Sequence, residues 1–444
     1  MLSTQRTVLL VAGLFALVIL LLRPVKIQRS PSREYAAFAP FVDSDVSNRT
    51  LGFARILVIN LPERTDRRDA MTLAASLTGL DVDWIEGWSG HDVHEKALPP
   101  DSWGRPMAYD NRGSWRAHMD ALRRVVETGL NTALIVEDDA DWDVRLKTQM
   151  PTLARATRGY VQPLVHDTSQ TLVNVTTSLG IPVLSIGELP DTLGPERSPY
   201  GDGWDVLWLG HCGTESPGSH ESTWTATEEP PSSTLSSRPT PTPEWPPPLQ
   251  ITLPNDTTVP GPEHLKPHPF ALPDPLGTLF PAHTRVVHAA GKTMCTQAYA
   301  VSQEGARRLL WQFGLETLTA GWDLMLRDWC ADTYLGQPGA SPRDHGPGKQ
   351  RWGKDGKGDL LDAAWKKKRP VCLTVQPPLF SHRFGKGAAS DMTAPGGGFV
   401  GKDKEMTPYI RLSTMSDAGS PGRSPPIFKR SARETVETLA SRPD

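Results

Sequence analysis

The sequence predicts an α/β fold with a mostly parallel sheet flanked by helices. Residues 56–59 (ILVI) form a short apolar run typical of a parallel strand buried on both faces, and residues 133–136 and 204–210 are predicted to be further strands. Helical patterns separate these runs, and strands that alternate with helices favour a parallel sheet. Ligands of such sheets bind beyond the carboxyl ends of the strands, so a site is expected there.

Composition narrows the class of protein. The 444 residues suffice for one large domain or two modest ones. The net charge of -3 is spread along the chain, which gives no electrostatic case for a nucleic-acid partner. The 42 prolines cluster, which predicts loops or disordered segments inserted into a globular frame.

The first helices follow from apolar periodicity. Residues 63–77 look helical behind the first strand, and residues 79–88 supply a second candidate strand. The clearest helix covers 114–128, with Ser114 as its N-cap and Gly129 as the left-handed residue after its end. Its apolar face steps by four, three and four residues through Trp115, Met119, Leu122 and Val126.

The second half of the chain alternates between order and disorder. Residues 213–280 are rich in proline, with eight prolines between positions 230 and 248, and are predicted to be a disordered insertion without a core element. A strand and a helix follow, with Ser302 as the N-cap and Gly314 as the terminator. A second disordered insertion is expected at 336–369. A last strand with an ordered loop then precedes a disordered tail at 393–444.

The N-terminus carries a membrane-anchor signal. The uninterrupted apolar run at 7–22 is expected to be a transmembrane signal anchor, because no small-x-small cleavage site follows it. This prediction leaves a short cytoplasmic tail at 1–6 and a stem at 23–53.

Local evidence leaves the orientation of the anchor open. Basic residues on its C-terminal flank favour a cytosolic body. Three glycosylation sequons favour a lumenal body instead, at Asn48, Asn174 and Asn255. The four cysteines permit three pairings in an oxidising lumen without requiring any, and their spacing excludes a compact zinc motif: Cys212, Cys295, Cys330 and Cys372.

An acidic cluster directly follows the apolar run at 133–136. It comprises Glu137, Asp138, Asp139, Asp141 and Asp143. Along an extended chain Glu137, Asp139 and Asp141 would lie in one row, with Asp138 opposite. Carboxylates in such a row suit Mg²⁺ or Mn²⁺, which can bridge to substrate phosphates. The alternative is a solvated acidic loop that merely ends a strand, but the apolar run would hold the acids rigidly at a sheet edge.

Three arginines follow the first strand, at a strand-to-helix junction. They are Arg64, Arg67 and Arg68. Helped by a helix N-terminus they could hold a diphosphate. Alternatively, they form a charged helix face that pairs with neighbouring acids. The junction lacks a glycine-rich phosphate loop, which excludes a Walker or dinucleotide site there.

One further acid is a candidate general base. Asp323 lies among apolar residues, a setting that raises the pKa of a carboxyl group and suits proton abstraction. A helix N-cap or a structural ion pair explains this residue equally well. His118 and His382 are isolated in the sequence and are interpreted as core or loop histidines.

In their order and spacing, seven segments resemble glycosyltransferase family 25, which contains bacterial lipooligosaccharide transferases and animal procollagen galactosyltransferases. They are ILVINLPERTDRRDAM, SWRAHMDALRRVVETG, ALIVEDDADWD, WDVLWLG, TQAYAVSQEGARRLL, GWDLML and VQPPLFSHRFGKGAASDM. The chain departs from this pattern at Ala117, where relatives more often carry Ser before His118, and in its long proline-rich insertion.

The resemblance implies a GT-A-type, Rossmann-like fold over residues 54–392, a UDP-sugar donor, and Mn²⁺ or Mg²⁺. It implies that five residues contact the nucleotide sugar: Asn60, Arg64, Arg67, Glu137 and Asp138. It places Asp139 at the metal, and the row alternation adds Asp141. Asp323 would then deprotonate the acceptor hydroxyl in a single displacement that inverts the anomeric centre, while the metal neutralises the leaving diphosphate.

The resemblance also implies the orientation that the flanking charges leave open, so the expected protein is a single-pass type II enzyme of the Golgi or ER membrane with a lumenal catalytic domain. It would transfer a hexose, galactose or glucose, from a UDP-sugar to a glycan or glycoprotein acceptor. The leading alternative is a non-catalytic carbohydrate-binding or scaffold protein on the same fold, and a third interpretation is a metal-dependent hydrolase. The sequence identifies neither the sugar nor the acceptor.

Overall fold

The computed structural model describes most of the expected globular region. The described residues are 43–99, 107–217, 248–262, 265, 276–332, 368–383 and 410–414. All of them belong to one compact unit, Pro40–Asp444. The predicted cytoplasmic tail and anchor lie outside the described residues, as do most of the stem and nearly all of the second insertion. No helix in the described part of the chain is long and apolar enough to cross a membrane.

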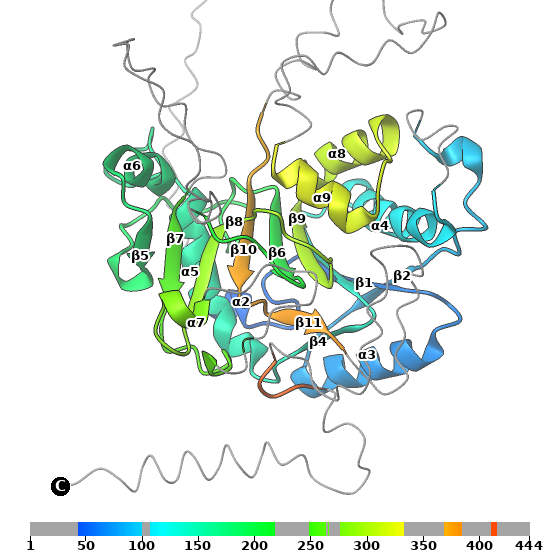
Figure 1. The fold of residues 1–444 in the computed structure, drawn as a ribbon, viewed down its shortest axis with the longest axis horizontal. Helices are drawn as coiled ribbons and strands as arrows, with labels where there is room; N and C mark the ends of the chain where they lie inside the picture. The colour runs from blue at the N-terminus through cyan, green and yellow to red at the C-terminus, as the bar shows by residue number, and fades with distance from the viewer. Residues whose placement is uncertain are drawn as a thin grey trace, which may run out of the picture. The chain divides into compact units, whose positions relative to one another are not determined.

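The described strands form one eleven-stranded sheet (Figure 1). From edge to edge its main path runs β2 (Asp83–Glu86), β1 (Arg55–Asn60), β3 (Thr132–Glu137), β9 (Ala298–Ser302), β6 (Val206–Gly210), β10 (Cys372–Gln376), β8 (Arg285–Ala289), β7 (Gln250–Leu253) and β5 (Val183–Ser185). Off this path, β11 (Phe380–His382) pairs with β6 and with β4 (Ala140–Trp142).

The sheet is mixed, so the prediction of a mostly parallel sheet is wrong. β1 is parallel to β2 and β3, and β6 is parallel to β10. However, β9 runs antiparallel to both of its neighbours, β3 and β6, and β8 is antiparallel to β10 and β7. An apolar run that is buried on both faces looks the same whichever way its strand points, so the pattern could not give the direction of β9.

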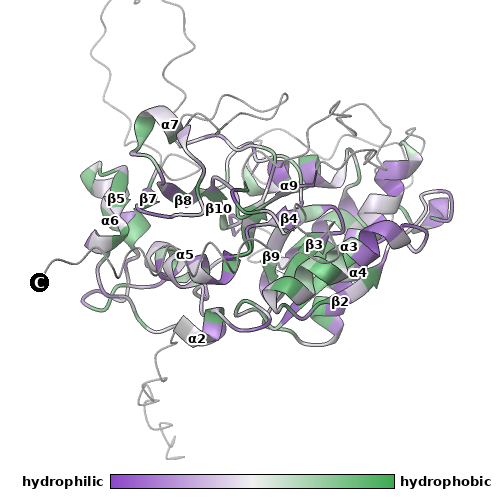
Figure 2. Ribbon diagram, turned by 90° about the horizontal axis from the view of Figure 1, so that it is seen from below, coloured by the Kyte–Doolittle hydropathy of each residue, from purple (hydrophilic) through white to green (hydrophobic). Residues whose placement is uncertain are grey.

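Helices cover both faces of the sheet, as predicted. One face carries α3 (Thr65–Thr78) and α5 (Leu146–Val161), and the other carries α4 (Tyr109–Glu127), α8 (Gln303–Trp311) and α9 (Trp322–Cys330). Along β3, Leu134 and Val136 join the core of the first face, whereas Ala133 and Ile135 join that of the second. Successive strand residues point to opposite faces, which explains why β3 is apolar over all of residues 133–136 (Figure 2).

The remaining described helices are short. They are α2 (Asp43–Val46), α6 (Leu172–Leu179), α7 (Leu276–Leu279), the 3₁₀ turns Glu95–Ala97 and Ile186–Glu188, and a π-helical segment at Gln312–Glu316.

Two predicted helix boundaries are correct and two are wrong. Gly129 is left-handed after α4, and Ser302 caps α8 by accepting a hydrogen bond from the Gly305 amide. Ser114, in contrast, lies inside α4, which begins at Tyr109. Gly314 does not end α8, because the chain continues into the π-helical segment that contains it. Polar residues extend α4 beyond the periodic apolar stretch from which its start was predicted.

Part of the predicted first insertion is ordered. β7 lies inside residues 213–280 and pairs with β8 and β5, so the expectation of no core element there is wrong. Leu249 and Ile251 are fully buried, although the proline-rich sequence before them gives no apolar period. Residues 218–247 lie outside the described part. Residues 410–414 of the predicted disordered tail are also described, and they pack against β4.

The cysteines form two disulfides. Cys212 pairs with Cys295, and Cys330 pairs with Cys372, which selects one of the three pairings that the sequence left open. The first disulfide joins the end of β6 to the segment before β9, and the second joins the end of α9 to the start of β10.

Candidate active site

The candidate site lies at the carboxyl ends of β1 and β3. These strands are parallel neighbours, and Ile59 of β1 is in register with Glu137 of β3. A turn at 138–139 then leads directly into β4. The side chains of Asn60 and of the acidic residues therefore meet at one edge of the sheet, where parallel α/β sheets bind their ligands.

Asp138 is held from the first strand and the first helix. Its Oδ1 accepts a 2.8 Å hydrogen bond from Arg67 Nη1, and its Oδ2 accepts one of 2.8 Å from Asn60 Nδ2. Arg67 projects from the first turn of α3, and all three side chains are buried. Burial, together with the charge of Asp139, raises the pKa of Asp138 to about 6, so this carboxylate is still mostly ionised at neutral pH.

Asp139 lies between Arg67 and His382. Its Oδ2 is 3.2 Å from Arg67 Nη1 and 3.2 Å from His382 Nε2. Burial alone would raise the pKa of Asp139, but the charges and hydrogen bonds of these two partners hold it well below its usual range. The same contact raises the pKa of His382 against the opposing effect of burial. Arg67 and His382 thus offset the repulsion within the acidic cluster.

The second oxygen of Asp139 is available to a ligand. Asp139 Oδ1 is buried and has no hydrogen-bond partner among the described residues. An orphaned carboxylate oxygen of this kind fits a divalent cation, which binds hard oxygen ligands. No group of three or more His, Cys, Asp or Glu in the described part of the chain could hold a metal by itself. A metal here would therefore complete its coordination with water and substrate oxygens, as Mg²⁺ commonly does.

Glu137 is oriented by contacts with Thr296 and His118. Its Oε1 accepts a 2.6 Å hydrogen bond from Thr296 Oγ1 and lies 3.5 Å from His118 Nε2. The other ring nitrogen of His118 lies 2.9 Å from the hydroxyl of Tyr299, and its ring stacks on Trp322. His118 is buried, as interpreted from the sequence, and it also links Glu137 to the side chains of Tyr299 and Trp322.

Asp323 of α9 lies near enough to Glu137 to feel its charge. It lies in the first turn of that helix, and its Oδ2 accepts a 3.1 Å hydrogen bond from the backbone amide of Cys295. Burial raises the pKa of Asp323, and the negative charge of Glu137 raises it further. The direction of this shift agrees with the sequence prediction. Cys295 and Thr296 are consecutive residues, so one short segment holds both Asp323 and Glu137.

Asp141 does not share a row with Glu137 and Asp139. The turn at 138–139 interrupts the extended chain, so the alternation from which the row was predicted does not apply. The carboxylate of Asp141 instead accepts hydrogen bonds from the Ser413 hydroxyl and from the hydroxyl and amide of Thr414. Asp143 is likewise occupied, by Arg145 and the Leu412 amide.

Comparison with known proteins gives a distant relationship. No model of a protein family matches the chain. It is 29% identical to procollagen galactosyltransferase 1 of Danio rerio over 114 residues, which are 23% of this chain and 19% of that protein. It is 25% identical to procollagen galactosyltransferase 2 of Mus musculus over 116 residues, which are 23% of this chain and 18% of that protein.

The chain is distantly similar to galactosyltransferases. The similarity spans less than a quarter of this chain and less than a fifth of either relative. It supports a relationship to such enzymes.

The structure brings together most of the predicted site residues. Asn60, Arg67, Glu137, Asp138, Asp139 and Asp323 lie around the same sheet edge. The guanidinium of Arg64 pairs with Asp66 at 2.8 Å, and the backbone carbonyl of Arg64 accepts a hydrogen bond of 3.1 Å from Asn60 Nδ2. Sequence reasoning missed Thr296, and it interpreted His118 and His382 as core or loop residues without a role at the site. Thr296 and His382 reach their acidic partners from distant parts of the chain.

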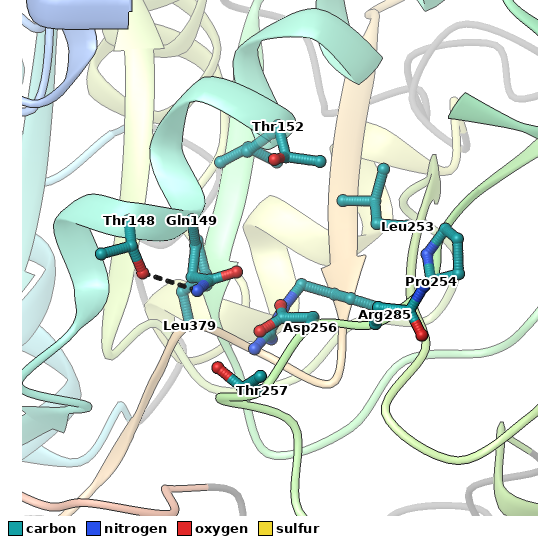
Figure 3. Close-up of a pocket in the computed structure, with 11 residues that line it drawn as sticks. Thr148, Gln149, Thr152, Leu253, Pro254, Asp256, Thr257, Arg285 and Leu379 are labelled. Carbon is teal, nitrogen blue, oxygen red and sulfur yellow. Dashed lines mark hydrogen bonds and ion pairs between the residues drawn. The ribbon is translucent and has the colours of Figure 1, made fainter. Parts of the chain in front are cut away.

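A separate polar pocket carries no candidate chemistry. In it, Gln149 of α5 lies opposite Asp256 and Arg285 (Figure 3). Arg285 Nε is 2.6 Å from Asp256 Oδ2, and the other guanidinium nitrogens donate to Thr258 and to backbone carbonyls. Because these charges are already paired within the protein, we place the site at residues 137–139, here called the acidic loop, and not in this pocket.

Proposed function

We propose that the protein is a metal-dependent glycosyltransferase that transfers a hexose, galactose or glucose, from a UDP-sugar to a glycan or glycoprotein acceptor. One observation carries the proposal. The acidic loop, residues 137–139, contains a buried carboxylate oxygen without a described hydrogen-bond partner, Asp139 Oδ1, and its Glu137 raises the pKa of a further buried carboxyl group, Asp323. The distant similarity to galactosyltransferases supports the same class of reaction.

The residues around Asp139 suit the leaving diphosphate of a glycosyl transfer, and Asp323 suits the acceptor hydroxyl. The leaving nucleotide diphosphate develops negative charge, and cationic groups positioned in advance stabilise such charge. Arg67 and His382 already lie at the acidic loop, and Asn60 borders it. A divalent cation held by Asp139 Oδ1, Mn²⁺ or Mg²⁺, would supply further Lewis-acid stabilisation when bound.

Asp323 is the proposed general base. Its raised pKa brings the carboxyl group closer to the pH at which a base accepts a proton most effectively. It would take the proton of the acceptor hydroxyl as that oxygen attacks the anomeric carbon and the bond to the diphosphate breaks. One such displacement inverts the anomeric centre. Glu137, next to Asp323, is oriented to bind the donor, with Asp138 supporting Asn60 and Arg67.

We further propose that the protein belongs to glycosyltransferase family 25. We also propose a type II membrane topology with the catalytic domain in the lumen. Disulfides form and persist in oxidising compartments such as the ER lumen, and the described chain contains two. The three sequon asparagines, Asn48, Asn174 and Asn255, are exposed. Treating the expressed protein with an endoglycosidase tests this assignment. We expect a mobility shift that decreases with each Asn→Gln substitution, and an unshifted protein would contradict a lumenal body.

The activity is tested with a panel of UDP-hexoses and candidate acceptors, with and without EDTA. We expect metal-dependent formation of a glycosylated product that Asp139→Asn abolishes. Glu63→Gln is the matched control, because Glu63 is an exposed acid outside the loop. Activity that neither chelation nor Asp139→Asn diminishes would exclude the metal-dependent mechanism. Donor cleavage to free sugar without any product would favour a hydrolase, and absence of both turnover and nucleotide binding would favour a non-catalytic protein.

A further inference from the structure

Residues 410–414 lie against the acidic loop, although more than 260 residues separate the two in sequence. The segment pairs with the chain just after β4: Ser413 forms a β-bridge with Asp143, and the Val144 amide donates to the Leu412 carbonyl at 3.0 Å. The Thr414 amide donates to the Trp142 carbonyl at 3.2 Å. The segment therefore continues the sheet beside the end of β4.

The segment occupies the two acids that the proposed catalytic chemistry leaves unused. Asp141 accepts hydrogen bonds from the Ser413 hydroxyl, from Thr414 Oγ1 at 2.7 Å and from the Thr414 amide at 3.2 Å. Asp143 accepts one of 3.0 Å from the Leu412 amide. Asp141 is 1% exposed and Thr414 is 0% exposed, so water does not replace these contacts. Loss of these hydrogen bonds would leave the desolvation of the buried carboxylate uncompensated and would destabilise this conformation.

The opposite partner of β4 connects this arrangement to Asp139. In β11, Ser381 is in register with Asp141 and His382 with Ala140, the residue after Asp139. The Arg383 amide donates to the Asp139 carbonyl at 2.7 Å, and His382 contacts the Asp139 side chain. Backbone hydrogen bonds thus connect β4 and the residue after it to β11 and to residues 410–414. Asp139 directly precedes β4, so its position depends on both contacts.

We propose that residues 410–414 are a positioning strap for the acidic loop, in which Ser413 and Thr414 act through Asp141 to hold Asp139 in its ligand-binding geometry. This inference rests on the proposed function for its ligand, a divalent cation with a nucleoside diphosphate. Groups that orient a metal ligand without touching the metal typically change metal affinity by about 10–100-fold when they are mutated. Ser413 and Thr414 are therefore positioning residues and not catalytic ones.

The test compares the full chain with its Ser413→Ala/Thr414→Val double variant. Mn²⁺ affinity is measured in the presence of UDP, well below the unfolding temperature, and hydrogen exchange is measured for the backbone amides of residues 137–144. Thr157→Val is the matched control, because Thr157 is also a buried threonine, and its hydroxyl donates a hydrogen bond to the Ala154 carbonyl within α5. Thr414→Ser, which keeps the hydroxyl, is the rescue variant.

We expect the double variant to bind Mn²⁺ at least about tenfold more weakly and to exchange faster at residues 137–144. The control and the rescue variant should keep the wild-type values. An unchanged Mn²⁺ affinity together with unchanged exchange in the double variant would overturn the inference. If the wild-type chain binds no Mn²⁺ with UDP, the proposed function fails, and the exchange measurement alone then decides whether the strap positions the loop.

Discussion

Arg67 Nη1 lies 2.8 Å from Asp138 Oδ1, and both side chains are almost completely buried. This pair joins the first turn of α3 to the turn after β3, so one ion pair connects the two strand ends that form the site. Nη1 also lies 3.2 Å from Asp139 Oδ2, which makes Arg67 the shared partner of two neighbouring carboxylates.

Arg67→Ala should destabilise the fold strongly. Removing one member of a buried ion pair leaves an uncompensated buried charge and costs about 3–5 kcal/mol. Chemical denaturation measures the loss. Arg64→Ala is the control, because Arg64 pairs with the exposed Asp66, and such surface pairs contribute at most about 1 kcal/mol. Equal losses in the two variants would contradict the assigned role of Arg67.

Asp323→Asn should remove the general base while leaving the donor site intact. We expect transfer to fall by about 10²–10⁴-fold, with the affinity for UDP and Mn²⁺ unchanged. Steady-state kinetics and binding titrations separate the two effects. Asp328→Asn lies on the same helix and pairs with its neighbour Arg327 at the surface, so it should keep the wild-type rate. A fully active Asp323→Asn enzyme would exclude this residue as the base.

Removing the disulfide between Cys212 and Cys295 should affect both stability and transfer. Cys295 and Thr296 hold Asp323 and Glu137, and this disulfide fixes their segment to the end of β6. We expect Cys212→Ser/Cys295→Ser to lose about 2–5 kcal/mol of stability and to show a lower kcat in its folded fraction.

The second disulfide provides the matched control for this prediction. Cys330→Ser/Cys372→Ser removes the disulfide between α9 and β10. It should cost a similar amount of stability, yet the folded fraction should keep its kcat. If the two double variants had the same kcat, the first disulfide would have no special role in positioning the site.

Stability should fall as the pH decreases below the ordinary pKa of histidine. Burial, together with the charges of His288 and Arg285, lowers the pKa of His211 to about 4. Because the folded-state pKa lies below the unfolded one, the unfolded chain binds more protons in the acidic range. The stability contributed by neutral His211 is therefore complete above about pH 6.5 and decreases toward pH 4 by about 3 kcal/mol.

Unfolding curves recorded between these two pH values check this prediction. His211→Gln should show a flatter dependence of stability on pH than the wild-type protein. His288, whose pKa burial also lowers, contributes in the same direction and remains in the variant. An unchanged slope in His211→Gln would show that His211 does not titrate in this range.

Several features of the site were predictable because they depend on local sequence. The apolar run before Glu137 predicts β3, and Asn60 directly follows the first apolar run, so each residue is expected at the end of a strand. The apolar neighbours of Asp323 predict the direction of its pKa shift correctly. Each of these predictions needs only the residues next to the one concerned.

The partners of the acidic residues could not be predicted in this way. His382 reaches Asp139, and Ser413 reaches Asp141, only after β11 and residues 410–414 have packed against β4. The alternation that would have put Asp141 beside the metal assumes an extended chain, and the turn at 138–139 breaks it.

The sequence by itself determined that strands buried on both faces alternate with helices and end in a cluster of carboxylates. Only the tertiary structure decided which strands run antiparallel, which cysteines pair, and which acid keeps an oxygen free for a ligand. The physical reason is that the burial pattern is set by each segment separately. Charge pairing depends instead on which distant groups arrive at the same edge of the sheet, as Arg67, His382 and Asp323 do around Glu137, Asp138 and Asp139.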